Sequence, residues 1–336
     1  VEVARASLER IAALDPGLNA MSQVVATEAL AEAESRDAAL AAGTPCGPLH
    51  GVPVVIKEEV DVAGTVTTFG GEGNSTPAAA DAEVVRRLRA AGAVVVGKTT
   101  MPEFGAWPYT EGTSRGLTRN PWDRSRTPGG SSGGTAVAVA TGMVPVGLGG
   151  DGGGSIRIPS AMCGLFGLKP QRGRVSTAPH PHLWWALGTA GPLTRTVLDS
   201  AIFYDAVRGN VATDLYAAGD TGSFTEAART DPGRLRIGWR RVGGRAGNAA
   251  GRGLRGRGLL RRLPPDHAIL VVAFARRGHL VHVELDLDLC RERLGPEHRG
   301  EQLIDLRVEL GFELRLEIQP PAIGVARLGQ KLAGLV

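Results

Sequence analysis

The chain has 336 residues, of which 43% are hydrophobic and 21% charged, and its net charge at neutral pH is +4. This balance excludes a chain that is disordered throughout and fits a folded protein with a large buried core. Its three cysteines, Cys46, Cys163 and Cys290, form no C-x-x-C pair, so neither a disulfide framework nor a cysteine-based zinc site is indicated. We expect a reducing compartment, the cytoplasm, and no metal or other cofactor.

Helical and strand patterns alternate along the chain. Helices are predicted at residues 2–14, 27–42, 81–91, 134–141 and 196–207, most of them followed by a glycine that ends the helix. Short runs rich in β-branched residues predict strands at 52–56, 93–96, 144–148, 235–239 and 280–285. This alternation predicts an α/β fold in which helices cover both faces of a sheet.

Residues 127–150 carry no charged side chain and could be mistaken for a membrane span. They contain eight glycines together with Pro128 and Pro145, which break the continuous apolar helix that a bilayer requires. We therefore expect this segment in the protein interior and expect no membrane contact. Residues 1–16 form a charged amphipathic helix pattern rather than a signal peptide, so secretion is not expected.

The charge is unevenly distributed. Residues 1–230 carry 19 basic and 22 acidic side chains, whereas residues 231–336 carry 19 and 12. Much of this surplus lies in residues 240–262, which hold eight arginines, seven glycines and no acid. Such a segment buries little apolar surface, so we interpret it as a solvated loop or linker. An RNA-contacting tract and a disrupted segment are the alternatives, but we do not expect nucleic acid as a partner.

Two glycine motifs match nucleotide-binding signatures, but in each case a neighbouring residue argues against nucleotide binding. GAVVVGKT, residues 92–99, fits the Walker A pattern, but its middle residues favour a strand and Pro102 follows where the phosphate-binding helix should begin. GLGGDG, residues 147–152, fits a dinucleotide-binding loop, but Asp151 would face the pyrophosphate and Pro159 interrupts the next helix. We favour neither function.

A third motif, GGSSGG at residues 129–134, matches the G-x-S-x-G nucleophile elbow around both Ser131 and Ser132. The serine of such an elbow needs an acid and a histidine as partners, and no histidine of the chain lies in a sequence pattern that marks it as this partner. A second serine–glycine loop, GGGSIR, places Ser155 24 residues after Ser131. A helix and a strand join the two loops, so we expect the loops to meet.

Lys57 is the candidate for activating a serine without histidine. It ends the apolar run GVPVVIK in a chain that has 34 arginines and four lysines. An arginine keeps its proton in a protein, whereas burial lowers the pKa of a lysine, so a neutral Lys57 could act as a base. The alternative is a lysine that extends to solvent or pairs with Glu58, Glu59 or Asp61.

Several segments together resemble the amidase signature family, specifically its acylamide amidohydrolases. They are GPLHGVPVVIKEEVDVAGTVTT, GAVVVGKTTMPEFG, TRNPWDRSRTPGGSSGGTAVAVATGMVPVGLGGDGGGSIRIPSAMCGLFGLKPQRGRVS and GPLTRTV. The resemblance extends from about Arg5 to Trp239 and implies a mixed, twisted sheet covered on both faces. It also implies hydrolysis of a small-molecule amide to the acid and ammonia or an amine.

The resemblance implies a Ser–cis-Ser–Lys triad. Ser155 would be the nucleophile, Ser131 the bridging serine held by a cis peptide, Lys57 the base, and Ser132 a hydrogen-bonding neighbour. The backbone N–H groups of Gly152, Gly153, Gly154 and Ser155 would form the oxyanion hole. Because a tetrahedral intermediate develops negative charge on the former carbonyl oxygen, glycines let several N–H groups converge on it.

Further residues are expected near the triad. Asp151 and Arg157 flank Ser155, and we expect them to pair and fix the loop. Trp107, Trp184 and Trp185 are predicted to line the substrate pocket, with core packing as the alternative. Cys163 is predicted to be a packed thiol.

The chain departs from the family pattern in three places. Lys57-Glu58-Glu59 stands where the family commonly has Lys-Asp-Asn, and a carboxylate pointing inward would raise the pKa of Lys57. Gly152 replaces a common threonine, which should loosen the oxyanion loop. Beyond Trp239 the likeness fades, and the chain ends before a typical member would.

The predicted organisation is an amidase signature core at 1–239, an Arg/Gly-rich loop or disrupted segment at 240–264, and a shortened remainder of the same α/β domain at 265–336. Within that remainder, residues 273–289 predict a helix and then a strand. Two other functions stay open: the glutaminase subunit of a tRNA-dependent amidotransferase and a catalytically silent truncated member. A homodimer is also left open.

Overall fold

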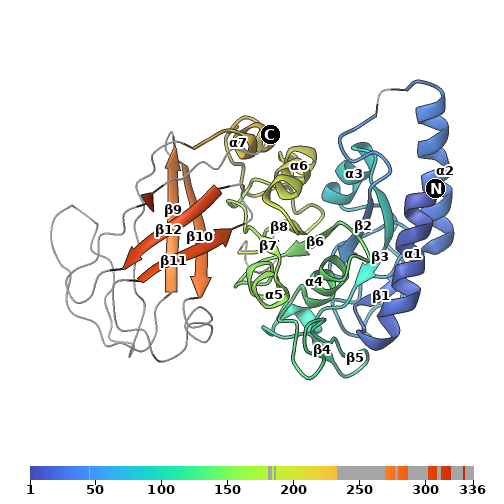
Figure 1. The fold of residues 1–336 in the computed structure, drawn as a ribbon. Coiled ribbons are helices and arrows are strands. Elements are labelled where there is room, and N and C mark those ends of the chain that lie inside the picture. Colours follow the sequence, from blue (N-terminus) through green and yellow to red (C-terminus); the bar gives the residue numbers. More distant parts are fainter. Residues whose placement is uncertain are drawn as a thin grey trace. The chain divides into compact units, whose positions relative to one another are not determined.

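The structure is a computed structural model. It describes residues 1–44, 46–180, 184 and 187–232, together with the backbone of five strands between residues 269 and 329. The chain divides into two compact units, Val1–Asp231 and Pro232–Val336 (Figure 1). The first unit contains all the residues predicted to be functional, of which Trp185 lies outside the described residues.

The helices of the first unit confirm all five predicted helices, with ends that differ by no more than two residues. They are α1 (Glu2–Leu14), α2 (Ala26–Ala41), α3 (Glu83–Ala90), α4 (Gly133–Ala140), α5 (Arg157–Cys163), α6 (Val197–Val207) and α7 (Phe224–Arg229). Two short 3₁₀ helices cover Asp15–Gly17 and Glu103–Gly105. The sequence did not predict α5 or α7. Pro159 does not interrupt α5, because it lies in the first turn, where a backbone N–H has no partner within the helix.

A six-stranded mixed sheet forms the centre of this unit. Its order is β1 (Met21–Val24), β3 (Val94–Thr99), β2 (Pro53–Lys57), β6 (Val146–Gly150), β8 (Ala190–Thr194) and β7 (Phe166–Gly167). Strand β2 runs parallel to β3 and β6, whereas β1, β8 and β7 are antiparallel to their neighbours. The short strands β4 (Glu111–Gly112) and β5 (Gly116–Leu117) form a separate hairpin. The mixed α/β fold expected from the sequence is confirmed.

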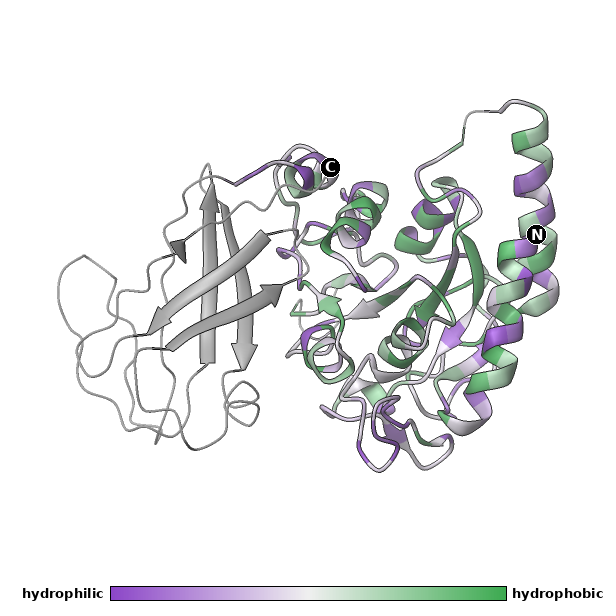
Figure 2. Ribbon diagram, viewed as in Figure 1, coloured by the Kyte–Doolittle hydropathy of each residue, from purple (hydrophilic) through white to green (hydrophobic). Residues whose placement is uncertain are grey.

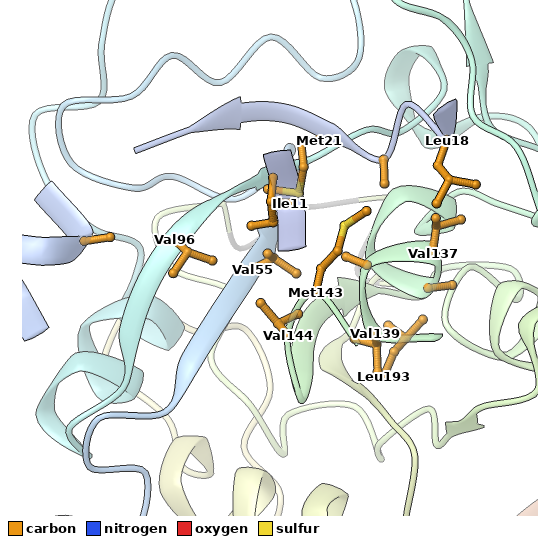
Figure 3. Close-up of a cluster of buried hydrophobic side chains, with 14 of the residues drawn as sticks. Ile11, Leu18, Met21, Val55, Val96, Val137, Val139, Met143, Val144 and Leu193 are labelled. Atoms are coloured by element: carbon orange, nitrogen blue, oxygen red, sulfur yellow. The ribbon is translucent and has the colours of Figure 1, made fainter. Parts of the chain in front are cut away.

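Both faces of the sheet are buried. Figure 2 shows hydrophobic residues along the central strands, and Figure 3 shows the cluster that contains Val55, Val96 and Leu193. Side chains of successive strand residues point to opposite faces. Val55 therefore packs in the cluster with α1, α2 and α4, while Val54 and Ile56 pack in the cluster with α3 and α6. Lys57 is two residues after Val55, so the pleat directs it to the face that α4 covers, next to the GGSSGG loop.

The uncharged segment 127–150 lies in the interior, as expected. Helix α4 buries Gly133 through Val139, and every residue of β6 is buried. Within the residues that the structure describes, no helix has the length and apolar character needed to span a bilayer.

The described backbone of the second unit consists of antiparallel strands. Strands β9 (Ile269–Arg276) and β10 (His279–Asp286) form one hairpin, and β11 (Gln302–Val308), β12 (Phe312–Ile318) and β13 (Leu328–Gly329) form a second sheet. The strand predicted at 280–285 is confirmed in β10. The helix predicted ahead of it is wrong, since the β-branched and aromatic residues of ILVVAFAR favour an extended strand. The predicted strand at 235–239 and the segment 240–264 lie outside the described residues.

Candidate active site

Lys57 and Ser131 are joined in the interior of the first unit. Lys57 is the last residue of β2 and is 1% exposed. Its Nζ lies 2.7 Å from Ser131 Oγ, within hydrogen-bond distance. Ser131 is also 1% exposed, and the Gly130–Ser131 peptide bond is cis, as the resemblance implies. The lysine therefore does not extend to solvent. It contacts the serine loop and also pairs with Glu59, as the alternative expected.

The two serine–glycine loops meet, as expected from the connection between them. The Ser132 N–H donates to the carbonyl oxygen of Ser155 at 3.2 Å. The Ser132 hydroxyl lies 3.2 Å from both the N–H and the carbonyl oxygen of Gly150, at the end of β6. Ser155 follows in the next loop and is partly exposed, and its hydroxyl makes no hydrogen bond within the described part of the chain. The position predicted for the nucleophile thus borders a buried Lys57–Ser131 pair.

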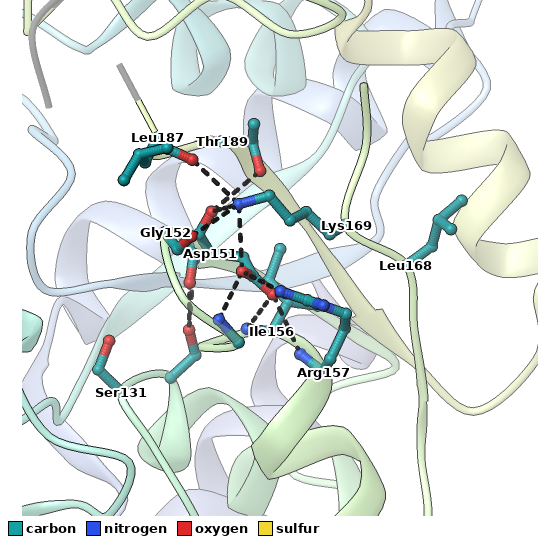
Figure 4. A network of polar contacts seen from close by, with 12 residues as sticks. Ser131, Asp151, Gly152, Ile156, Arg157, Leu168, Lys169, Leu187 and Thr189 are labelled. Carbon is teal, nitrogen blue, oxygen red and sulfur yellow. Dashed lines mark hydrogen bonds and ion pairs between the residues drawn. The ribbon is translucent and has the colours of Figure 1, made fainter. Parts of the chain in front are cut away.

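The Asp151 carboxylate forms hydrogen bonds within the loop after β6, and Figure 4 shows its contacts with Ile156, Arg157 and Lys169. Its carboxylate accepts hydrogen bonds from the N–H groups of Gly154 at 2.8 Å and Ile156 at 3.1 Å. Arg157 donates to both carboxylate oxygens, each at 3.0 Å, so the predicted Asp151–Arg157 pair is present. Burial raises the pKa of Asp151, but the hydrogen bonds and charge of Arg157, with the charge of Lys169, outweigh it and lower the pKa to about 2.

Three of the four N–H groups assigned to the oxyanion hole are available. Those of Gly152, Gly153 and Ser155 donate to no acceptor among the described residues. The resemblance also implies this role for the Gly154 N–H, but that group donates to Asp151. The reason is the tight turn after β6, which folds the loop back over the Asp151 carboxylate.

The two carboxylates that follow Lys57 point in different directions. Glu59 Oε1 lies 3.1 Å from Lys57 Nζ, and both side chains are buried. Glu58 turns away and accepts hydrogen bonds from Thr68 and from the N–H of Gly70. The inward carboxylate is therefore Glu59.

Gly150 makes room for the pair of Lys57 and Glu59. A Cβ added at this position would lie 2.0 Å from Glu59 Oε1 and 3.7 Å from Lys57 Nζ. Since real Cβ atoms essentially never approach a neighbour within 3.0 Å, a Cβ at this point of β6 would displace the Glu59 carboxylate.

Two further lysines were not predicted to be functional. Lys98 of β3 is fully buried and donates to Thr67 Oγ1 at 2.8 Å. Burial lowers its pKa to about 8, although the charges of Glu58 and Asp61 oppose this shift. Lys169 follows β7 and contacts the Ser155 loop. The signal that could have identified both is the rarity of lysine in an arginine-rich chain.

The tryptophans and Cys163 can be placed as follows. Trp107 is 54% exposed and stacks on Tyr109, with 5.7 Å between the ring centroids. Trp184 is 40% exposed and covers Gly152, whose added Cβ would lie 3.3 Å from the indole ring. Neither ring is packed in the core, so core packing, the alternative expected for these tryptophans, is wrong for Trp107 and Trp184.

Cys163 is buried, and burial raises the pKa of its thiol to about 12, as expected for a packed thiol.

Comparison with known proteins places this arrangement in a family. The family model described as Amidase matches residues 2–246. The chain is 54% identical over 230 residues to "Putative amidase AmiB2" of Mycobacterium tuberculosis (strain ATCC 25618 / H37Rv), a match that covers 68% of this chain and 48% of that protein. It is 48% identical over 212 residues to a glutamyl-tRNA(Gln) amidotransferase subunit of Acidothermus cellulolyticus, covering 62% of this chain and 42% of that protein.

Solved structures agree with this placement. The peptide amidase of Stenotrophomonas maltophilia is 36% identical with a TM-score of 0.62, covering 69% of this chain and 49% of that one. The 6-aminohexanoate cyclic dimer hydrolase is 35% identical with a TM-score of 0.63, covering 70% and 48%. The chain spans about half the length of the curated relatives it matches. A family model that matches most of the chain, together with these relatives, shows that the chain belongs to the amidase signature family.

Proposed function

We propose that this chain hydrolyses a carboxylic amide to the acid and ammonia or an amine through an acyl-enzyme on Ser155. The observation that carries the proposal is the buried 2.7 Å contact between Lys57 Nζ and Ser131 Oγ. It lies beside the loop of Ser155 in a chain of the amidase family. A buried hydroxyl next to an amine is suited to pass a proton, and a partly exposed hydroxyl is suited to meet a substrate.

The proposed reaction begins with Lys57 as a neutral amine. Lys57 Nζ takes the proton of the Ser131 hydroxyl, and Ser131 Oγ takes the proton of Ser155 as Ser155 Oγ bonds to the amide carbon. When the C–N bond breaks, the same relay returns a proton to the leaving nitrogen. Water then attacks the ester carbon and gives one proton to the relay. The bond between that carbon and Ser155 Oγ breaks, the acid leaves, and the relay returns the proton to Ser155 Oγ.

The N–H groups of Gly152, Gly153 and Ser155 are proposed to stabilise the oxyanion of the tetrahedral intermediate. All three lack an acceptor among the described residues and flank the Ser155 hydroxyl in one loop. Loss of one such donor typically lowers kcat by about 10²–10³-fold. Trp184, whose indole covers Gly152, is proposed to line the substrate's approach to this loop.

The glutaminase function remains the second candidate because an amidotransferase subunit is 48% identical to this chain. The higher identity of 54% to an amidase relative favours the amidohydrolase. Measuring ammonia release from glutamine and from simple carboxamides, with no partner protein present, separates the two. Turnover of carboxamides in preference to glutamine supports our proposal.

Covalent labelling tests the nucleophile and the silent-member alternative together. A fluorophosphonate probe should label the wild-type chain, and peptide mass spectrometry should locate the adduct on Ser155. Ser155→Ala should abolish labelling, whereas Ser114→Ala, which changes an exposed serine of the 111–117 hairpin, should not. An adduct on any other residue would refute the assignment, and no labelling of the wild type would favour a silent protein.

A further inference from the structure

Lys169 donates hydrogen bonds to main-chain carbonyl groups at the start of the loop that carries Ser155. Its Nζ donates to the carbonyl oxygens of Asp151 and Gly152, the latter at 3.0 Å, and to the carbonyl oxygen of Leu187 at 3.0 Å (Figure 4). The Asp151 carboxylate lies 3.3 Å away. The three protons of this ammonium are therefore directed mainly to peptide carbonyls.

Peptide geometry turns these contacts into a constraint on the oxyanion hole. In a trans peptide the carbonyl of one residue and the N–H of the next lie in one plane and point in opposite directions. An ammonium on the Asp151 carbonyl therefore directs the Gly152 N–H away from Lys169. In the same way, an ammonium on the Gly152 carbonyl directs the Gly153 N–H away from it. Both N–H groups are among the three that lack an acceptor in the described part of the chain.

The Gly152 carbonyl depends on Lys169 more than the Asp151 carbonyl does. Asp151 O also accepts hydrogen bonds from the N–H of Thr189 at 3.1 Å and from its hydroxyl at 3.2 Å. Among the described residues, Gly152 O accepts from Lys169 alone. Gly153 has no neighbour within 4 Å of an added Cβ, and Trp184 is the side chain that lies over Gly152. Among the described residues, Lys169 is thus the one hydrogen-bond donor that holds the Gly152 carbonyl and, with it, the orientation of the Gly153 N–H.

The contact with Leu187 adds a second function for the same group. Leu187 lies three residues after Trp184, and its N–H donates to the Trp184 carbonyl at 2.9 Å. Lys169 therefore connects Trp184 to the loop that Trp184 covers.

The ammonium also affects the strength of the N–H donors. A carbonyl bound to a cation is polarised, which makes the N–H of the same peptide a stronger donor.

We propose that Lys169 is a positioning residue for amide hydrolysis, which orients the Gly152 and Gly153 N–H groups toward the carbonyl oxygen of the substrate. This inference rests on the proposed function of the Ser155 loop. Lys169 contacts neither the nucleophile nor the relay, so its effect should appear where an oxyanion forms and not where the substrate merely binds. Arginine should replace it poorly, because a planar guanidinium cannot direct three diverging donors as an ammonium does.

The test compares two inhibitors of one scaffold. A trifluoromethyl ketone forms a tetrahedral oxyanion adduct with a catalytic serine, whereas the matching trifluoromethyl carbinol binds without forming one. Lys169→Met should raise the inhibition constant of the ketone by about 10²-fold, and lower kcat by about as much, while the carbinol constant and KM change little. Lys169→Arg retains the cation beside Asp151 and should raise the ketone constant by about 10-fold.

The outcomes separate this inference from the proposed function. Suppose that the wild-type protein hydrolyses amides. If Lys169→Met then raises the inhibition constants of the ketone and the carbinol by the same factor, or leaves both unchanged, Lys169 does not orient the oxyanion hole. Should Lys169→Met fail to fold, the ratio of the two constants in Lys169→Arg decides, and a wild-type ratio overturns the inference. If the wild type neither turns over amides nor binds the ketone covalently, the proposed function itself fails.

Discussion

Substituting Gly150 with alanine should disable the site through a single methyl group. Gly150 lies at the end of β6 with an extended backbone that alanine also adopts, so the change adds volume without a conformational penalty. The added Cβ would lie 2.0 Å from Glu59 Oε1. The carboxylate would have to move by about 1 Å to reach the shortest distance that real Cβ atoms show.

That displacement lengthens the Lys57–Glu59 contact, whose Nζ–Oε1 distance is 3.1 Å, and so removes the partner that holds the amine beside Ser131 Oγ. Displacing a catalytic group by about 1 Å can reduce turnover by about 10²-fold, which corresponds to about 2.7 kcal/mol of activation free energy. Overpacking a buried site should also lower the free energy of unfolding by about 1–3 kcal/mol.

The assay is kcat on an amide that the wild type hydrolyses, with thermal unfolding measured in parallel. Gly73→Ala is the matched control, because a Cβ there has no neighbour within 4 Å. In a Glu59→Ala background the same Gly150→Ala change should have little further effect, since the clashing atoms are gone. Two results would contradict a steric clash with Glu59. One is a kcat of Gly150→Ala within about threefold of wild type, and the other is an equal loss of kcat when Gly150→Ala is added to Glu59→Ala.

Three further predictions concern the same unit. Lys57→Arg places a permanent cation beside Glu59 that cannot accept a proton, so kcat should fall by about 10²–10⁴-fold, and near-normal turnover would exclude Lys57 as the base. In the folded protein the pKa of Asp151 is lowered from 3.8 to about 2. The ionised carboxylate should therefore stabilise the fold by about 2 kcal/mol above pH 4, and this stabilisation should be lost as the pH falls toward 2. Chemical unfolding of wild type and Asp151→Asn between pH 2 and 6 checks this, and parallel curves would contradict it. Iodoacetamide at pH 8 should alkylate exposed Cys46 but not buried Cys163 in the folded protein, as read by peptide mass spectrometry.

Within the described part of the first unit, local signals in the sequence predicted five of the seven α-helices and three of the six strands of the central sheet. Glycines after the helical patterns located the ends of α2 and α4, and the runs around Val55 and Val95 identified the buried strands. Strand β8 was not predicted, because AGPLT carries glycine and proline where strands favour β-branched residues. Its place in the sheet is determined by pairing with β6, a tertiary contact that no local pattern encodes.

The sequence also does not determine which of the two carboxylates, Glu58 or Glu59, points toward Lys57. Both carboxylates follow Lys57, and a continued strand would direct residues 57 and 59 to one face. The strand ends at Lys57, so the sequence alone does not determine whether that alternation persists into the turn. The contacts of Glu58 with Thr68 and Gly70 decide it, and they come from a loop about ten residues further along the chain.

Lys169 illustrates why some functional residues leave no motif. Its partners are carbonyl oxygens, which every residue possesses, so no spacing of residue types marks the contact. Composition still carries a signal. In a chain with 34 arginines, the three lysines that the structure describes, Lys57, Lys98 and Lys169, are all buried or half-buried and hydrogen-bonded to named acceptors. Arginine serves wherever a solvated or paired cation suffices, and an ammonium remains where a compact donor or a removable proton is needed.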